Sequence, residues 1–173
     1  MSFLNVEIKA HCTNADPIRQ YLIRNNAVYK GLDEQTDTYF NVVHGRLKLR
    51  EGNIENNLIW YERANDDGPK NSHFQLVKIE DAAGLKETLI KSIGIKVIVK
   101  KKREIYYIEN VKFHMDEVEG LGSFIEIEAG NVLADLPYEK LKEQCDFYIK
   151  EFAIEPADFI NVSYSDMLLA QEE

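Results

Sequence analysis

Several segments of this chain alternate between apolar and charged residues with a period of two. In 4–10, for example, Leu4, Val6 and Ile8 share one face, whereas Glu7 and Lys9 share the other. Successive side chains of a β-strand point to opposite faces, so the pattern predicts strands with one apolar and one charged side. Short connections favour antiparallel neighbours. The predicted strands are 4–10, 36–43, 45–51, 58–63, 74–80, 95–109, 111–119 and 123–129.

Helices are fewer and gather mostly at the end of the chain. Asp16 and Pro17 predict an N-cap followed by a proline at the first helical position. Ser163 and Asp166 have the spacing of a capping box, which predicts a short last helix. No linker or repeat interrupts the chain, so one α+β domain spanning 1–173 is expected. The other predicted helices cover 16–26, 81–93 and 137–153.

The charge of the chain is divided unevenly along its 173 residues. The formal net charge is −9, which argues against a nonspecific binder of nucleic acid or of anionic membranes. Residues 1–103 hold 17 Lys and Arg against 13 Asp and Glu, a net +4, and residues 104–173 carry −13. No apolar stretch approaches the ~20 residues of a membrane span. Without a signal peptide or a cysteine motif, a reduced cytoplasmic protein is expected.

The charged faces of the strands allow two interpretations. Taken alone, the alternation favours a one-sided antiparallel sheet whose charged face lies in water. Alternatively, the sheet closes into a barrel that holds the charges in its lumen, with helices covering the apolar outside. Buried charges need partners, so such a lumen would require a polyanion and metal ions to balance it.

Seven short motifs follow one another along almost the whole chain, and their order is more specific than any one of them. They are NVEIKA (5–10), DTYF (37–40), GRLKLRE (45–51), YER (61–63), KKKRE (100–104), MDEVEGLGSFIEIE (115–128) and SYSDML (163–168). The series resembles the CYTH superfamily of triphosphate tunnel metalloenzymes, and most closely its class IV adenylyl cyclase branch.

The resemblance implies an antiparallel eight-stranded β-barrel, open as a tunnel, with helices packed outside. It implies binding of a small-molecule triphosphate together with Mg²⁺ or Mn²⁺, and conversion of ATP to cyclic AMP and pyrophosphate. A triphosphatase acting on inorganic, thiamine or nucleoside triphosphate is one alternative, and a noncatalytic triphosphate-binding protein is another. The cyclases of this family are dimers, so a homodimer is also implied.

The resemblance also assigns site residues. Metal ligands would be Glu7, Asp116, Glu126 and Glu128; carboxylate oxygens suit hard divalent cations. The phosphates would be bound by Lys9, Lys48, Arg50, Arg63, Lys78, Lys101 and Arg103, since arginine forks fit phosphate oxygens and lysine acts as a point charge. Of these, Glu7, Lys9, Arg63, Lys101 and Arg103 would be catalytic. The alternative is a set of solvated strand residues and surface salt bridges.

Two positions depart from the family pattern. Asn5 replaces the first glutamate of the motif, and an amide is a poorer metal ligand than a carboxylate. His73 stands where the cyclase branch often has an acid. The four histidines lack ligand spacing, and each is interpreted as a surface or packing residue. Tyr164 is typical of the cyclase branch but is also compatible with simple packing.

Overall fold

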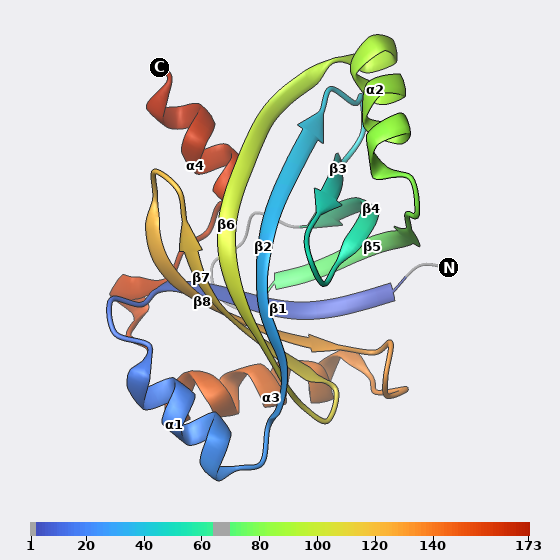
Figure 1. Cartoon of the computed structure of the whole chain (residues 1–173). Helices are drawn as coiled ribbons and strands as arrows, with labels where there is room; N and C mark the ends of the chain where they lie inside the picture. The colour runs from blue at the N-terminus through green and yellow to red at the C-terminus, as the bar shows by residue number, and fades with distance from the viewer. Residues whose placement is uncertain (1–2, 64–69) are drawn as a thin grey trace.

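The computed structural model describes residues 3–63 and 70–173, and the side chains of Arg63, Lys70 and Asn71 also lie outside that description. Within the described residues, eight antiparallel strands close into a barrel in the order β1-β5-β4-β3-β2-β6-β7-β8 (Figure 1). The strands are β1 (Phe3–His11), β2 (Val28–Phe40), β3 (Arg46–Glu51), β4 (Asn56–Arg63), β5 (Lys70–Lys78), β6 (Ile95–Ile108), β7 (Val111–Val118) and β8 (Gly122–Gly130).

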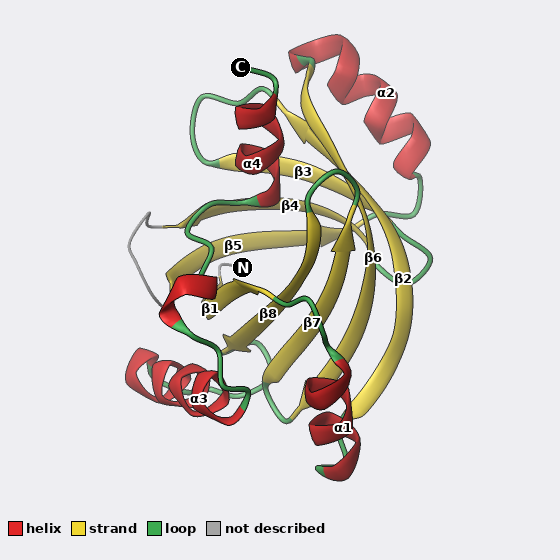
Figure 2. Ribbon diagram, turned by 90° about the vertical axis from the view of Figure 1, so that its left-hand side faces the viewer, coloured by secondary structure: helices red, strands yellow, loops and turns green. Residues whose placement is uncertain are grey.

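Four α-helices in the described part of the chain pack around this barrel. They are α1 (Asp16–Arg24), α2 (Ala82–Ile93), α3 (Tyr138–Glu151) and α4 (Tyr164–Gln171), with a short 3₁₀ turn at Pro156–Asp158. α1 and α3 lie at one end of the molecule in both views, and α4 lies at the other (Figures 1 and 2). No helix in the described ranges is long and apolar enough to cross a membrane.

The outer core lies between the barrel and the pair α1 and α3. Val6 and Ile8 of β1, together with outward residues of β7 and β8, pack against Leu22 of α1 and Leu141 of α3. These apolar positions alternate with the charged ones, as the period-two pattern requires. The helices thus cover the apolar side of these strands, and the charged side faces the lumen.

A second apolar cluster fills the barrel interior beside α4. Val99 and Phe124 share the inward faces of β6 and β8, and they cluster with Tyr39 and with Tyr164 at the start of α4. The Ser163 side chain accepts a hydrogen bond from the backbone N–H of Asp166, which confirms the predicted cap of this helix. One end of the lumen is therefore packed with apolar groups, and the charged groups lie deeper along the axis.

Closure of the barrel shows that the open-sheet interpretation is wrong and that the barrel interpretation is right. Several local predictions also differ from the structure, and β5, for example, spans Lys70–Lys78 rather than 74–80. β2 begins at Val28 rather than at 36, because a β-bulge at Gly31, with φ +123°, breaks the alternation that marks a strand. The N-cap of α1 is Ala15, and Asp16 lies inside the first turn, where it pairs with Arg19.

Candidate active site in the barrel lumen

The barrel encloses a cavity of about 820 Å³ that inward-facing residues of all eight strands line. Tyr164 bounds it at the α4 end, and Leu76, Val132 and Leu133 also line it. Leu133 is 66% exposed and Val132 is 50% exposed, so this part of the wall opens to solvent. The cavity is of the size that binds organic ligands.

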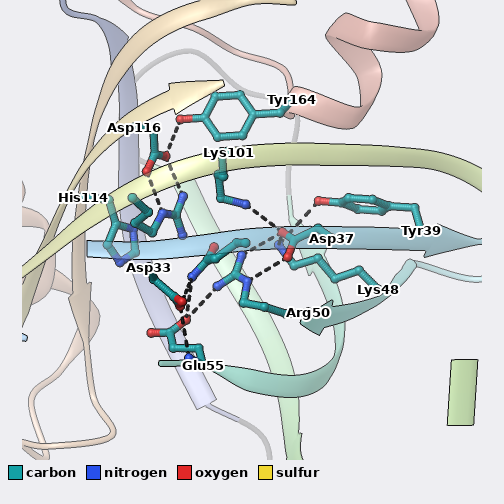
Figure 3. A network of polar contacts seen from close by, with 12 residues as sticks. Asp33, Asp37, Tyr39, Lys48, Arg50, Glu55, Lys101, His114, Asp116 and Tyr164 are labelled. Carbon is teal, nitrogen blue, oxygen red and sulfur yellow. Dashed lines mark hydrogen bonds and ion pairs between the residues drawn. The ribbon is translucent and has the colours of Figure 1, made fainter. Parts of the chain in front are cut away.

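One group of charges is centred on Asp37 of β2 (Figure 3). Arg50 of β3 donates from Nε and Nη2 to its two carboxylate oxygens, each at 2.8 Å. The Nζ atoms of Lys101 and Lys48 lie 2.9 and 3.2 Å from Asp37 Oδ2. Burial alone would raise the pKa of the Asp37 carboxyl, but the three cations hold this pKa well below its usual range.

Lys101 is the most deeply buried of these lysines. Burial lowers the pKa of its ammonium to about 7; Asp37 opposes the shift, whereas Arg50, Arg103 and Lys48 add to it. Removing a cation from water disfavours its charged form, and neighbouring cations act in the same direction. Lys101 is therefore a lysine whose charge depends on pH near neutrality.

A second group of charges joins β6, β7 and β8. Arg103 donates to both oxygens of Asp116, at 2.7 and 2.6 Å, and to Glu126 at 3.1 Å. The Tyr164 hydroxyl donates to Asp116 at 2.7 Å (Figure 3). His114 Nδ1 lies 3.2 Å from Glu126 Oε2. Asp116 is thus engaged by donors from two elements, and it fixes the direction of the Arg103 guanidinium.

Three carboxylates line the cavity where β1 meets β8. Glu7 is paired in register with Glu128, and Lys9 is paired with Glu126. Burial, together with Glu7 and Glu126, raises the pKa of Glu128 to about 7, although Lys112 opposes the shift. The side-chain amide of Asn5 donates a hydrogen bond to Glu128.

The donor set on β1 and β8 fits a hard divalent cation. Oxygen ligands are what Mg²⁺ and Mn²⁺ prefer, and a bound cation would offset the repulsion that raises the pKa of Glu128. Among the described residues, no three His, Cys, Asp or Glu side chains are already gathered as a complete metal site. Mg²⁺ commonly keeps water and substrate oxygens as ligands, so two or three protein carboxylates suffice.

The structure brings most of the residues predicted from the sequence into this one cavity. Asp116 lies beside the cavity rather than on its lining, and Lys78 lines it as an exposed residue of β5. Arg63 is the last residue of β4, and its side chain lies outside the described residues. The residues that line the cavity as expected are Glu7, Lys9, Lys48, Arg50, Lys101, Arg103, Glu126 and Glu128.

Four further charged or titratable groups belong to the site and had no predicted role. Asp37 lies within the DTYF motif, and Lys112 and His114 share the strand face of Asp116, so alternation along β7 contained a signal for both. Glu55 lies between β3 and β4 and contacts Arg50 at 2.9 Å and Lys112 at 3.5 Å; no sequence pattern indicated it.

His114 corrects a prediction about the histidines. Its ring is 2% exposed and lines the lumen, where it contacts Glu126 rather than solvent. Burial and the Arg103 charge lower its pKa to about 4, so the ring is neutral near pH 7. Arg46, which neighbours the phosphate-binding positions of β3 in the sequence, is not among the residues that line the cavity. It forms an ion pair with Asp166 of α4 at 2.6 Å.

The family model for the CYTH domain matches residues 4–157 of the chain. The chain belongs to the CYTH domain family. A Methanocaldococcus jannaschii protein named "putative adenylate cyclase" is 26% identical to it over 95% of this chain and 98% of the relative. The ordered motifs indicated this membership, and the closed eight-stranded barrel is the fold that they implied.

Solved structures share the fold. A Pyrococcus horikoshii protein has a TM-score of 0.79 at 22% identity, covering 94% of this chain and 98% of its own. A Pyrococcus furiosus protein has a TM-score of 0.78 at 25% identity with the same coverage. A Vibrio parahaemolyticus protein named "putative adenylate cyclase" has a TM-score of 0.76 at 19% identity, covering 95% of this chain and 97% of its own.

Proposed function

We propose that this CYTH protein is a metal-dependent adenylyl cyclase that converts ATP to cyclic AMP and pyrophosphate. The observation that carries the proposal is that carboxylates and cations line one cavity in numbers that suit a metal and a polyanion together. Glu7, Glu126 and Glu128 come from β1 and β8, whereas Arg50 and Lys101 come from β3 and β6. A divalent cation is bound by the first kind of group, and a triphosphate by the second.

The entrance of the cavity favours an organic triphosphate over an inorganic one. Leu76, Val132 and Leu133 line the part that opens to solvent, and Phe74 also lines the cavity. Apolar walls with a few charged groups are typical of sites that bind a ring next to a polar group. The name of the Methanocaldococcus jannaschii relative agrees with a nucleotide substrate.

In this proposal the cations and the carboxylates of the lumen have separate tasks. Lys9, Lys48, Arg50, Lys101 and Arg103, with Arg63 and Lys78, bind the phosphate oxygens. Glu7, Glu126 and Glu128 hold the cation, and Asp116 keeps Arg103 in place. A bound Mg²⁺ or Mn²⁺ would neutralise phosphate charge and polarise the phosphorus.

The reaction joins the 3′-oxygen of ATP to the α-phosphorus, and the bond from that phosphorus to the pyrophosphate oxygen breaks. As the new bond forms, the 3′-hydroxyl gives its proton to water or to the departing pyrophosphate, and pyrophosphate keeps the electron pair of the broken bond. Lys9, Lys101 and Arg103 are the candidate catalytic cations here, together with Arg63, because fixed positive groups stabilise charge that develops on the phosphate oxygens.

Product analysis tests the proposal. Purified protein is incubated with ATP and either Mg²⁺ or Mn²⁺, and with inorganic and thiamine triphosphate in parallel. The proposal expects cyclic AMP and pyrophosphate from ATP in equal amounts. Release of orthophosphate instead identifies a triphosphatase, and metal-dependent binding without turnover identifies a noncatalytic binder. The cytoplasmic location and the homodimer remain predictions.

Variants of the carboxylates test the metal assignment. Glu126→Ala and Glu128→Ala should each lower kcat/KM by about 10²-fold or more, as the loss of groups that orient a cation and its substrate implies. Glu62→Gln, on the exposed side of β4, is the matched control and should leave activity unchanged. Full activity in both alanine variants would show that the metal assignment is wrong.

A further inference from the structure

We propose that Asp37 is a positioning residue that holds three phosphate-binding cations of the lumen in a fixed arrangement. The inference rests on the proposed function and concerns a residue to which neither the sequence analysis nor that proposal gave a role. The three cations come from two strands that flank β2 in the barrel, and they are Lys48, Arg50 and Lys101.

The contacts of Asp37 fix the directions of all three cations. The Arg50 guanidinium is held at two points, Nε and Nη2, each 2.8 Å from a carboxylate oxygen, so it cannot rotate about its axis. Lys101 Nζ is 2.9 Å and Lys48 Nζ is 3.2 Å from the same oxygen, Oδ2. The Asp37 residue itself is 1% exposed, so water does not compete for these oxygens.

Asp37 contacts all three cations, whereas Glu55 contacts only Arg50 among them, at 2.9 Å, so three cations against two carboxylates leave a surplus of positive charge. A lysine ammonium carries three N–H donors, and Lys101 directs one of them to Asp37. The remaining donors stay available to an anion in the cavity, which Lys48, Arg50 and Lys101 all line. Asp37 therefore orients the cations and lessens their mutual repulsion, without cancelling the charge that would attract a triphosphate.

Orientation of this kind acts mainly on the chemical step. Donors that are already aimed need no reorganisation when charge develops on the phosphate oxygens. If Asp37 is replaced by the isosteric Asn, the amide nitrogen faces a cation, and at least one of the contacts is lost. The site then keeps its attraction for a polyanion but loses its alignment, so kcat should fall more than binding does.

The charge of Lys101 provides a second readout. The charged groups around its Nζ are Asp37 from β2, Lys48 and Arg50 from β3, and Arg103 on β6 itself, with the Tyr164 ring of α4 at 6.0 Å. Asp37 is the anion of this set, and it opposes the burial and the neighbouring cations that lower the pKa of Lys101 to about 7. Without it, Lys101 should lose its proton at a lower pH.

The test compares the wild-type protein with Asp37→Asn. We expect kcat for ATP to fall by about 10- to 100-fold, as misalignment by about 1 Å does, while KM at pH 6 does not rise. The alkaline fall of kcat/KM, which reports the free enzyme, should move to lower pH. Glu104→Gln is the matched control. Glu104 forms a bidentate pair with Arg19 on the outer side of β6, at 3.0 and 2.7 Å, and its loss should leave both constants within twofold.

A kcat within twofold of the wild-type value, or an alkaline limb that does not move, overturns the positioning role. Thermal melting of Asp37→Asn is the check that the variant is folded. If the wild-type protein turns over no ATP, the proposed function has failed separately. Calorimetry with inorganic triphosphate at pH 6 and pH 8 then decides: the affinity of Asp37→Asn should fall more between the two pH values than that of the wild type, and equal falls reject the role.

Discussion

At the scale of single residues, burial sets the charge state of the site. Burial raises the pKa of the Glu128 carboxyl to about 7, and it lowers the pKa of the Lys101 ammonium to about 7. Asp37 is buried and Glu126 is half-buried, yet their carboxyls keep pKa values well below the usual range, because cations contact them directly. The charge of each of these groups thus depends on its burial together with the charges that contact it.

Glu128 makes the affinity for Mg²⁺ depend on pH. Its carboxyl must lose a proton before it binds a cation, so affinity should rise by about tenfold between pH 6 and pH 8. Glu128→Gln should weaken Mg²⁺ binding and flatten this dependence, and Glu62→Gln should change neither. Calorimetric titration of the metal-free protein measures both effects. A pH-independent affinity in the wild type would contradict the assignment of Glu128 as a ligand.

At the scale of elements, α4 closes one end of the lumen through its first residue. The Tyr164 hydroxyl donates to Asp116, Lys9 Nζ lies 3.8 Å from the ring centroid, and Phe124 packs against the ring. Lys9 lies 3.5 Å from Glu126, and Asp116 is linked to Glu126 through Arg103, which contacts both carboxylates. A helix outside the barrel therefore supports the side chains that bind phosphate and metal in the proposed function.

Tyr164→Phe should lower the free energy of unfolding by about 1.5–3 kcal/mol, the usual contribution of a hydrogen bond to a charged group. The ring and its contacts with Lys9 and Phe124 remain, so the effect isolates the bond to Asp116. Urea denaturation measures it. Tyr29→Phe is the control, because Tyr29 is 52% exposed on β2 and should change stability by less than about 0.5 kcal/mol. Equal effects of the two variants would contradict the role of α4.

At the scale of the whole molecule, the net charge of −9 does not describe the interior, where cations and carboxylates line the same cavity. Within the described residues, the lumen already balances many of its charges internally, through Asp37 with its three cations and Arg103 with its two carboxylates. A polyanion and metal ions are therefore not needed to provide that balance, contrary to the expectation from the strand pattern. A small polyanion should therefore bind a preorganised site rather than assemble it.

Inorganic triphosphate should stabilise the folded protein selectively. At a free concentration of about 100 times Kd, binding to the native state adds about 2.7 kcal/mol, which raises Tm. Duplex DNA, which cannot enter the lumen and is repelled by the acidic protein, should leave Tm unchanged, as should orthophosphate at the same concentration. Thermal melting in the three ligands checks this. An equal rise of Tm with DNA would place the binding surface outside the barrel.

Which residues share a strand face could be predicted from alternation along the chain. The side-chain period of two is a local property, so Glu126 with Glu128, and Lys48 with Arg50, could be placed on one side without knowledge of the fold. The order of the motifs then indicated a CYTH barrel, and the family model confirms that membership. The same local rule failed at Gly31, because a bulge interrupts the period.

Which charges contact one another depends on how strands that are distant in the chain pair in the barrel. Alternation alone fits an open sheet as well as a barrel, since closure depends on pairing between β1 and β5 and between β1 and β8, far apart in the chain. The three cations around Asp37 come from other strands. The pKa of His114 is lowered by burial and by Arg103, which lies on another strand. Electrostatic energies depend on distance in space and on burial, and neither can be read from the spacing of residues along a strand.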